Sequence, residues 1–168
     1  QMCIRDRLSP IRKSELLLYT TLVHIGNQEY KVAKKYISNA IIDHNIKYLP
    51  LMRTIRLVRL IVFYEVQEHE LIQYESRSIT RSLSSPKEQT FKTERIILWF
   101  LNKRNIPILK KDREAFWEKL SPEIHELYNN KYESQLLRLF DFTAWMESKI
   151  RKEKLSEVLR ARTSAKEC

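Results

Sequence analysis

Glycine is almost absent from this chain. Gly26 is the only glycine among 168 residues, where average composition would place about 12. Glycine-rich phosphate loops, dinucleotide-binding turns and nucleophile elbows all need glycine at fixed positions, because their backbones adopt conformations that other residues reach only at a cost. The sequence therefore excludes these motifs and favours long helices joined by short connections.

Helix start and stop signals follow one another closely along the chain. Ser9-Pro10 and Ser121-Pro122 each place an N-cap residue before a proline at the first helical position, and Gly26-Asn27 is a stop signal. Residues 112–120 and 122–128 form either two short helices or one kinked helix. No segment shows the alternation of apolar and polar residues that is typical of a strand. The predicted helices cover residues 10–25, 28–43, 50–66, 68–83, 88–103, 112–120, 122–128, 132–150 and 155–159.

The length of the chain predicts one helical-repeat domain over residues 8–150, followed by a charged C-terminal tail with a short helix at 151–168. Residues 1–7 resemble a translated sequencing-adaptor fragment, and a disordered basic arm is the alternative; either interpretation excludes them from the fold. Because the first residue is Gln1, we expect the chain to be the C-terminal part of a longer protein.

The formal net charge is +10 and 31% of the residues are charged. Acidic residues accompany the basic ones throughout, which favours a solvated mixed-charge surface over a dedicated polyanion site. Cys3 and Cys168 lie at opposite ends, so no disulfide framework or zinc knuckle is predicted. The most apolar stretch, residues 51–64, carries three arginines, which argues against a membrane span and leaves a cytoplasmic location as the expectation.

Catalytic and metal-binding patterns find little support. His69-Glu70 is followed by Gln73 where a zinc peptidase helix would need a second histidine. The four histidines fall on separate predicted elements without the spacing of metal ligands, and no nucleophile with a matching base can be nominated. We therefore expect no catalytic residues, no metal site and no cofactor.

Arg53, Arg56 and Arg59 are the candidate site residues. They occupy a sector of about 120° on the helix predicted at 50–66. Three forked cations beside apolar residues could hold a carboxylate-bearing peptide or a phosphate backbone. The alternative is that these arginines pair with glutamates of the next helix while their stems cover apolar surface.

Two predicted helices of the second half each carry a pair of adjacent aromatic residues. Trp99 and Phe100 on one helix, and Phe116 and Trp117 on the next, most simply fill the core between helices. The helix predicted at 132–150 is apolar around much of its circumference. We expect it to be packed between other helices; the alternative is that it exposes an apolar face to a partner.

An offset of 38 residues aligns the first two predicted helices with the next two. Leu22 then meets Leu60 and Val23 meets Ile61, whereas Ile37 meets Glu75. A further shift by 38 residues matches less well. The self-match predicts two successive helical pairs.

One segment carries a resemblance to a known family. The spacing of Tyr30, Ala33, Tyr36, Ala40 and Ile41 resembles the second helix of a tetratricopeptide repeat. The resemblance implies antiparallel helical hairpins stacked as a short α-solenoid, with the first helix of each pair lining a concave face and therefore with Arg53, Arg56 and Arg59 near a groove. The period of 38 exceeds the usual 34, and no proline follows Ala40 at the expected distance.

Two other blocks, residues 63–83 and 140–149, resemble the C-terminal segment of uncharacterised bacterial helical-repeat proteins, which implies no activity. Three function classes follow from the sequence. We expect a non-catalytic protein-interaction or scaffold module with a protein or peptide partner, because stacked helical pairs offer extended surfaces. The alternatives are an RNA- or DNA-binding helical repeat and the accessory region of an enzyme whose active site precedes residue 1.

Overall fold

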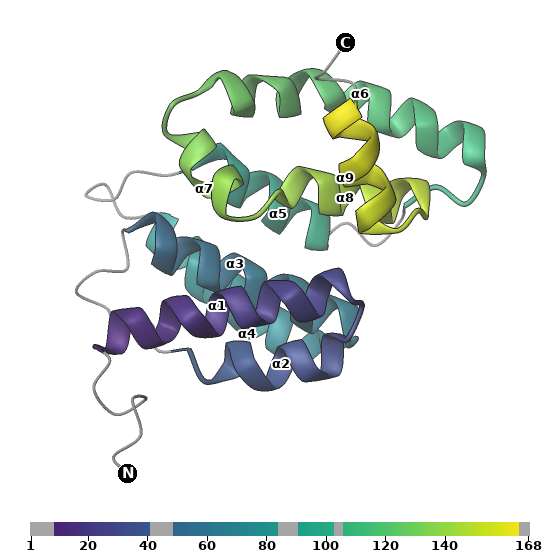
Figure 1. Ribbon diagram of the computed structural model, residues 1–168. Coiled ribbons are helices and arrows are strands. Elements are labelled where there is room, and N and C mark those ends of the chain that lie inside the picture. The colour runs from purple at the N-terminus through teal and green to yellow at the C-terminus, as the bar shows by residue number, and fades with distance from the viewer. Residues whose placement is uncertain (1–8, 41–48, 84–90, 103–105, 165–168) are drawn as a thin grey trace. The chain divides into compact units, whose positions relative to one another are not determined.

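The computed structural model describes residues 9–40, 49–83, 91–102 and 106–164. The segment predicted as an artefact or arm, residues 1–7, lies outside these ranges. Every regular element among the described residues is an α-helix (Figure 1), which confirms the all-α fold class. The described residues fall into two compact units, one within residues 1–90 and the other within residues 91–168, and the domain predicted over residues 8–150 includes parts of both.

The described residues of the first unit form four helices. They are α1 (Pro10–Gly26), α2 (Tyr30–Ser38), α3 (Pro50–Glu65) and α4 (His69–Leu83). The predicted starts at Pro10 and Pro50 are confirmed, and the Ser9 hydroxyl accepts a hydrogen bond from the Arg12 amide as the N-cap of α1. The second helix ends at Ser38, earlier than the predicted residue 43, because Asn39 caps it and donates its side-chain amide to the Lys35 carbonyl.

The turns α1–α2 and α3–α4 share one hydrogen-bond pattern. Gln28 and Gln67 both adopt left-handed backbone conformations, with φ of 62° and 61°. The next amides, of Glu29 and Glu68, donate to carbonyls five residues earlier at 2.8 and 2.9 Å. Each turn is therefore a Schellman motif, formed without glycine at the left-handed position.

The equivalent turn residues lie 39 positions apart, one more than the self-match in the sequence. With this offset, buried positions at and after α2 meet buried positions of α4. The pairs are Ala33 with Ile72, Ile37 with Ser76, and Ala40 with Ile79. An offset of 38 would instead pair the buried Ala33 with Leu71, which is 37% exposed.

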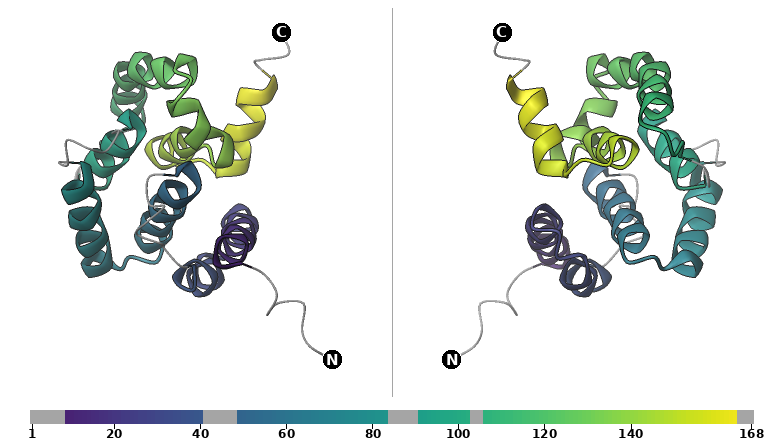
Figure 2. Two further views of the ribbon diagram at one scale, coloured as in Figure 1. Left: turned by 90° about the vertical axis from the view of Figure 1, so that its left-hand side faces the viewer. Right: turned by 90° about the vertical axis from the view of Figure 1, so that its right-hand side faces the viewer.

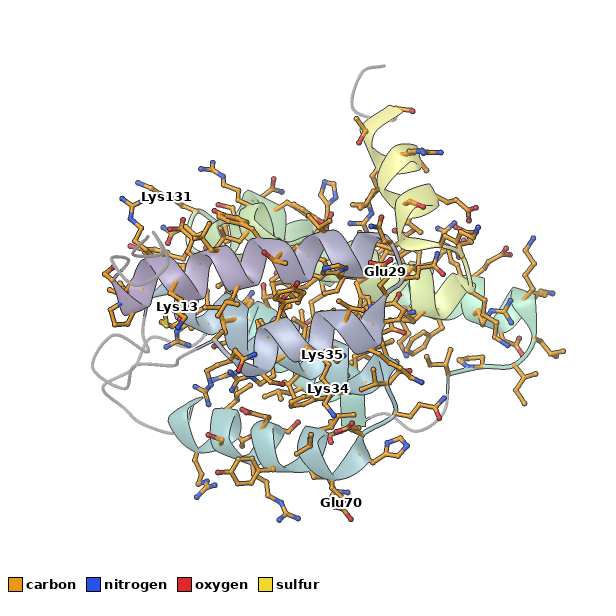
Figure 3. All side chains as sticks on the ribbon, turned by 60° about the horizontal axis from the view of Figure 1, so that its bottom comes forward. Lys13, Glu29, Lys34, Lys35, Glu70 and Lys131 are labelled. Atoms are coloured by element: carbon orange, nitrogen blue, oxygen red, sulfur yellow. The ribbon has the colours of Figure 1, made fainter. Side chains whose placement is uncertain are left out.

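Helix α3 packs against α1, α2 and α4 and is buried along most of its length. Figure 2 shows α1 and α2 nearly end-on, lying side by side as their contacts require. Lys34 of α2, labelled in Figure 3, forms an ion pair with Glu68 in the α3–α4 turn. This ion pair connects α2 to the α3–α4 turn.

Five helices lie in the part of the second unit that the structure describes. They are α5 (Lys92–Asn102), α6 (Lys110–Asn129), α7 (Glu133–Leu139), α8 (Phe142–Arg151) and α9 (Leu155–Ser164). Helix α8 packs against α5, α6 and α9, and α7 packs against α5 and α6. Residues 110–129 form one helix with Pro122 inside it, which decides between the two alternatives left by the sequence.

The prediction of a single helix at 132–150 is wrong, because the helix is interrupted at Phe140 and Asp141. Phe140 is extended, with φ −155° and ψ 131°. The Asp141 carboxylate accepts the Ala144 amide at 2.9 Å and so caps a new helix. The short turn predicted at 155–159 belongs to a longer helix, which ends at Ser164.

Glu133 fixes the start of α5 from another helix. Its carboxylate is buried and accepts the amides of Lys92 and Thr93 at 2.6 and 3.0 Å and the Thr93 hydroxyl at 2.8 Å. An anion at a helix N-terminus satisfies amides that have no partner within the helix. This contact orients α5 relative to α7.

Candidate functional site

The structure places two of the three predicted arginines in buried positions. Arg53 is 4% exposed and Arg56 is 9% exposed. The Arg56 guanidinium donates to the Ser78 hydroxyl of α4 at 3.2 Å. These guanidinium groups therefore lie within the fold and present little surface to a ligand.

Arg59 joins three helices of the first unit. Its Nη2 donates to the Ile37 and Ala40 carbonyls at 3.3 and 2.9 Å, and its Nη1 lies 3.2 Å from a carboxylate oxygen of Glu75 on α4. Carbonyls at the end of α2 lack partners within the helix and attract a cation. Arg59 thus makes the pairing with a glutamate of the next helix that the sequence offered as the alternative to a ligand groove.

The second unit contains an open apolar pocket between α5 and α6. Its volume is about 460 Å³. Trp99 and Phe116 stack at its wall, with ring centroids 6.1 Å apart and planes 17° from parallel. The pocket is lined by Arg95, Ile96, Trp99, Phe116, Lys119, Leu120 and Glu123.

The expectation that Trp99 fills the core is wrong, because 44% of its surface is exposed. The helical period of the sequence indicated that Trp99 lies on an exposed face. Lys92, Arg95, Trp99 and Asn102 recur along one face of α5 and all four are exposed, whereas Ile96, Ile97 and Phe100 are buried. A large aromatic in line with three polar residues indicates an exposed ring.

The rim of the pocket is mainly basic. Arg95 and Lys119 are exposed residues on α5 and α6, and Glu123 supplies one carboxylate one turn beyond Lys119. An aromatic wall with cations at its edge suits a ligand that combines an apolar group with a negative charge.

A second cluster of the same unit surrounds Arg162 of α9. Its Nη1 donates to the Tyr128 hydroxyl at 2.7 Å, to the Thr143 hydroxyl at 2.8 Å and to Asp141 at 3.1 Å. Its Nε and Nη2 donate to one oxygen of Glu147 at 2.9 and 2.6 Å. Burial alone would lower the pKa of Arg162, but Asp141, Tyr128 and Glu147 outweigh it and raise that pKa.

Burial, together with the Asp141 charge, raises the pKa of Tyr128 from 10.0 to about 12. The unfolded chain therefore loses the proton of the Tyr128 hydroxyl at a lower pH than the folded chain does. The contribution of the protonated hydroxyl to the free energy of unfolding is complete below pH 10 and is lost as the pH rises toward 12.

We predict that the melting temperature of the wild type falls more steeply between these pH values than that of Tyr128→Phe, which has no phenol to ionise. Circular dichroism melts across this range would measure both slopes, and parallel slopes would contradict the prediction.

Within the part of the chain that the structure describes, no three His, Cys, Asp or Glu side chains are grouped as metal ligands. None of its described helices combines the length and the apolar character needed to cross a bilayer. Comparison of the sequence with known protein families and with curated proteins, and of the fold with solved structures, found no match.

Proposed function

We propose that this chain is a non-catalytic protein-interaction module that binds a partner segment in the pocket between α5 and α6. The observation that carries the proposal is Trp99, a large aromatic that is 44% exposed at the wall of a pocket of about 460 Å³. Tryptophan and arginine are enriched among the residues that dominate binding energy at protein interfaces. Trp99 would supply the apolar anchor.

The chemistry of the pocket indicates the kind of segment that fits. An apolar side chain would lie against Trp99 and Leu120, and a neighbouring carboxylate would reach Arg95 or Lys119 at the rim. The net charge of +10 adds long-range attraction for an acidic partner. We therefore propose an acidic peptide segment with one bulky apolar residue.

The first unit would serve as the scaffold of this module. We propose that α1–α2 and α3–α4 are two antiparallel hairpins of a short tetratricopeptide-like α-solenoid. The shared Schellman turns at Gln28 and Gln67 and the matching burial at an offset of 39 residues support this arrangement.

Single-stranded RNA or DNA is the second candidate ligand of the α5–α6 pocket. The stacked pair of Trp99 and Phe116, flanked by Arg95 and Lys119, combines an aromatic surface with cations. Bases stack on such surfaces with little sequence preference. Glu123 at the same rim repels a run of phosphates more than it repels a single peptide carboxylate, and for this reason we propose the peptide first.

Selection from a random peptide library on the immobilised chain tests the proposal. We expect the selected peptides to share one bulky apolar residue next to Asp or Glu. Trp99→Ala should weaken their binding at least about tenfold, because it removes the anchor. Tyr74→Ala, which removes a ring that is 67% exposed on α4, is the matched control and should leave the affinity unchanged.

A selection that yields no shared pattern would contradict the proposal. Equal losses in Trp99→Ala and Tyr74→Ala would also contradict it, since the pocket would then not be the binding site.

A further inference from the structure

The acceptors around Arg162 are held in place by contacts that do not involve α9. The Tyr128 hydroxyl donates to Asp141 at 2.7 Å and lies 2.5 Å from the Thr143 hydroxyl oxygen. Asp141 also accepts the Thr143 hydroxyl and the Ala144 amide at 2.8 and 2.9 Å. These groups belong to α6 and to the start of α8, so they form a preorganised set of acceptors.

Two further groups complete the surroundings of the guanidinium. Glu147 of α8, whose side chain is 11% exposed, takes two hydrogen bonds from Arg162. The ring of Trp117 on α6 lies 5.8 Å from the guanidinium carbon. Carboxylates on two sides and an aromatic ring suit a planar, forked cation better than an ammonium.

Helix α9, which brings Arg162 to this position, buries little else. Val158 is its one buried residue, Leu155 is half-buried and Leu159 is 39% exposed. The helix follows a tight turn in which Lys152 has a left-handed backbone, with φ 60°. Attachment through one fully buried apolar residue and one guanidinium suits a segment that can be displaced.

The site also has room beside its present occupant. A cavity of about 550 Å³ borders Arg162 and extends along His125 and Asn129 of α6. A side chain arriving from outside could approach through this space before Arg162 leaves.

We propose that the cluster of Trp117, Tyr128, Asp141, Thr143 and Glu147 is a binding site for an arginine side chain of a partner protein, occupied in the free chain by Arg162. The partner's arginine competes with α9 for the same acceptors, so its binding releases α9. This site shares no residue with the lining of the α5–α6 pocket and does not depend on the function proposed for that pocket.

The full chain carrying Arg162→Ala tests the proposal, because that variant vacates the site. The probe is N-acetylarginine amide, titrated by nuclear magnetic resonance, with N-acetyllysine amide as the matched control. We expect the arginine probe to bind Arg162→Ala at least about tenfold more tightly than the wild type, where Arg162 competes. The lysine probe should bind both proteins weakly, and adding Glu147→Gln to Arg162→Ala should abolish the preference for arginine.

A measurement on the wild type covers the case in which Arg162→Ala does not fold. Amide hydrogen exchange of α9 should accelerate when the arginine probe is added in excess and should not change with the lysine probe. Unchanged exchange in α9 with both probes would overturn the proposal. Equal binding of the two probes to a folded Arg162→Ala would overturn it as well.

Discussion

Replacing Trp145 with alanine is expected to lower the free energy of unfolding of the second unit by about 3–5 kcal/mol. Trp145 is fully buried on α8, the helix that packs against α5, α6 and α9. Its ring meets Phe100 edge to face, with centroids 5.6 Å apart. The substitution removes this contact and leaves a cavity that rigid neighbouring helices can only partly close.

Urea denaturation followed by circular dichroism would measure this loss. Trp99→Ala is the matched control, because it removes a side chain of equal size that is 44% exposed; we expect it to cost about 1 kcal/mol. Equal losses in the two variants would show that α8 is not the centre of the second unit.

Replacing Arg59 with methionine is expected to destabilise the first unit by about 3 kcal/mol. The change removes the cation paired with Glu75, whose side chain is 14% exposed, and the donor to two carbonyls at the end of α2. A nearly buried carboxylate left without its partner accounts for most of the cost, since methionine replaces the apolar stem.

Arg77→Met, at an exposed position of α4, should change stability by less than about 0.5 kcal/mol. Combining Arg59→Met with Glu75→Gln should cost less than the sum of the two single changes, because the unpaired charge is removed. If the costs of the two single changes simply add in the double variant, the ion pair contributes nothing to stability.

The fold features that the sequence predicted well are those with local causes. The starts of α1 and α3 depend on prolines at their first positions, which act within one turn. The break at Asp141 was missed because this aspartate stands within an apolar run, and its capping role is supported by contacts with Tyr128 and Arg162 from distant parts of the chain. Such contacts leave no periodic signal.

The offset at which apolar residues match is 38, whereas the turn conformations and the buried positions of the first unit match at 39. Leu71 is apolar yet 37% exposed, whereas Ser76 is polar and buried, so matching apolar residues favoured 38 over 39. The same limit applies to the arginine sector: the helical period predicted that Arg53, Arg56 and Arg59 lie close together on α3, but it carried no information on whether that sector faces solvent or neighbouring helices.

Fluorescence anisotropy with two labelled probes at about 150 mM salt tests the proposed function most directly. One probe is a short acidic peptide with a single apolar anchor, and the other is a mixed single-stranded oligonucleotide. We expect the peptide to bind more tightly than the oligonucleotide. Trp99→Ala and Lys119→Glu should both weaken the binding of the peptide, because these residues form the wall and the rim of the α5–α6 pocket. Tighter binding of the oligonucleotide, lost in Trp99→Ala, would contradict the protein-interaction account in favour of nucleic-acid binding.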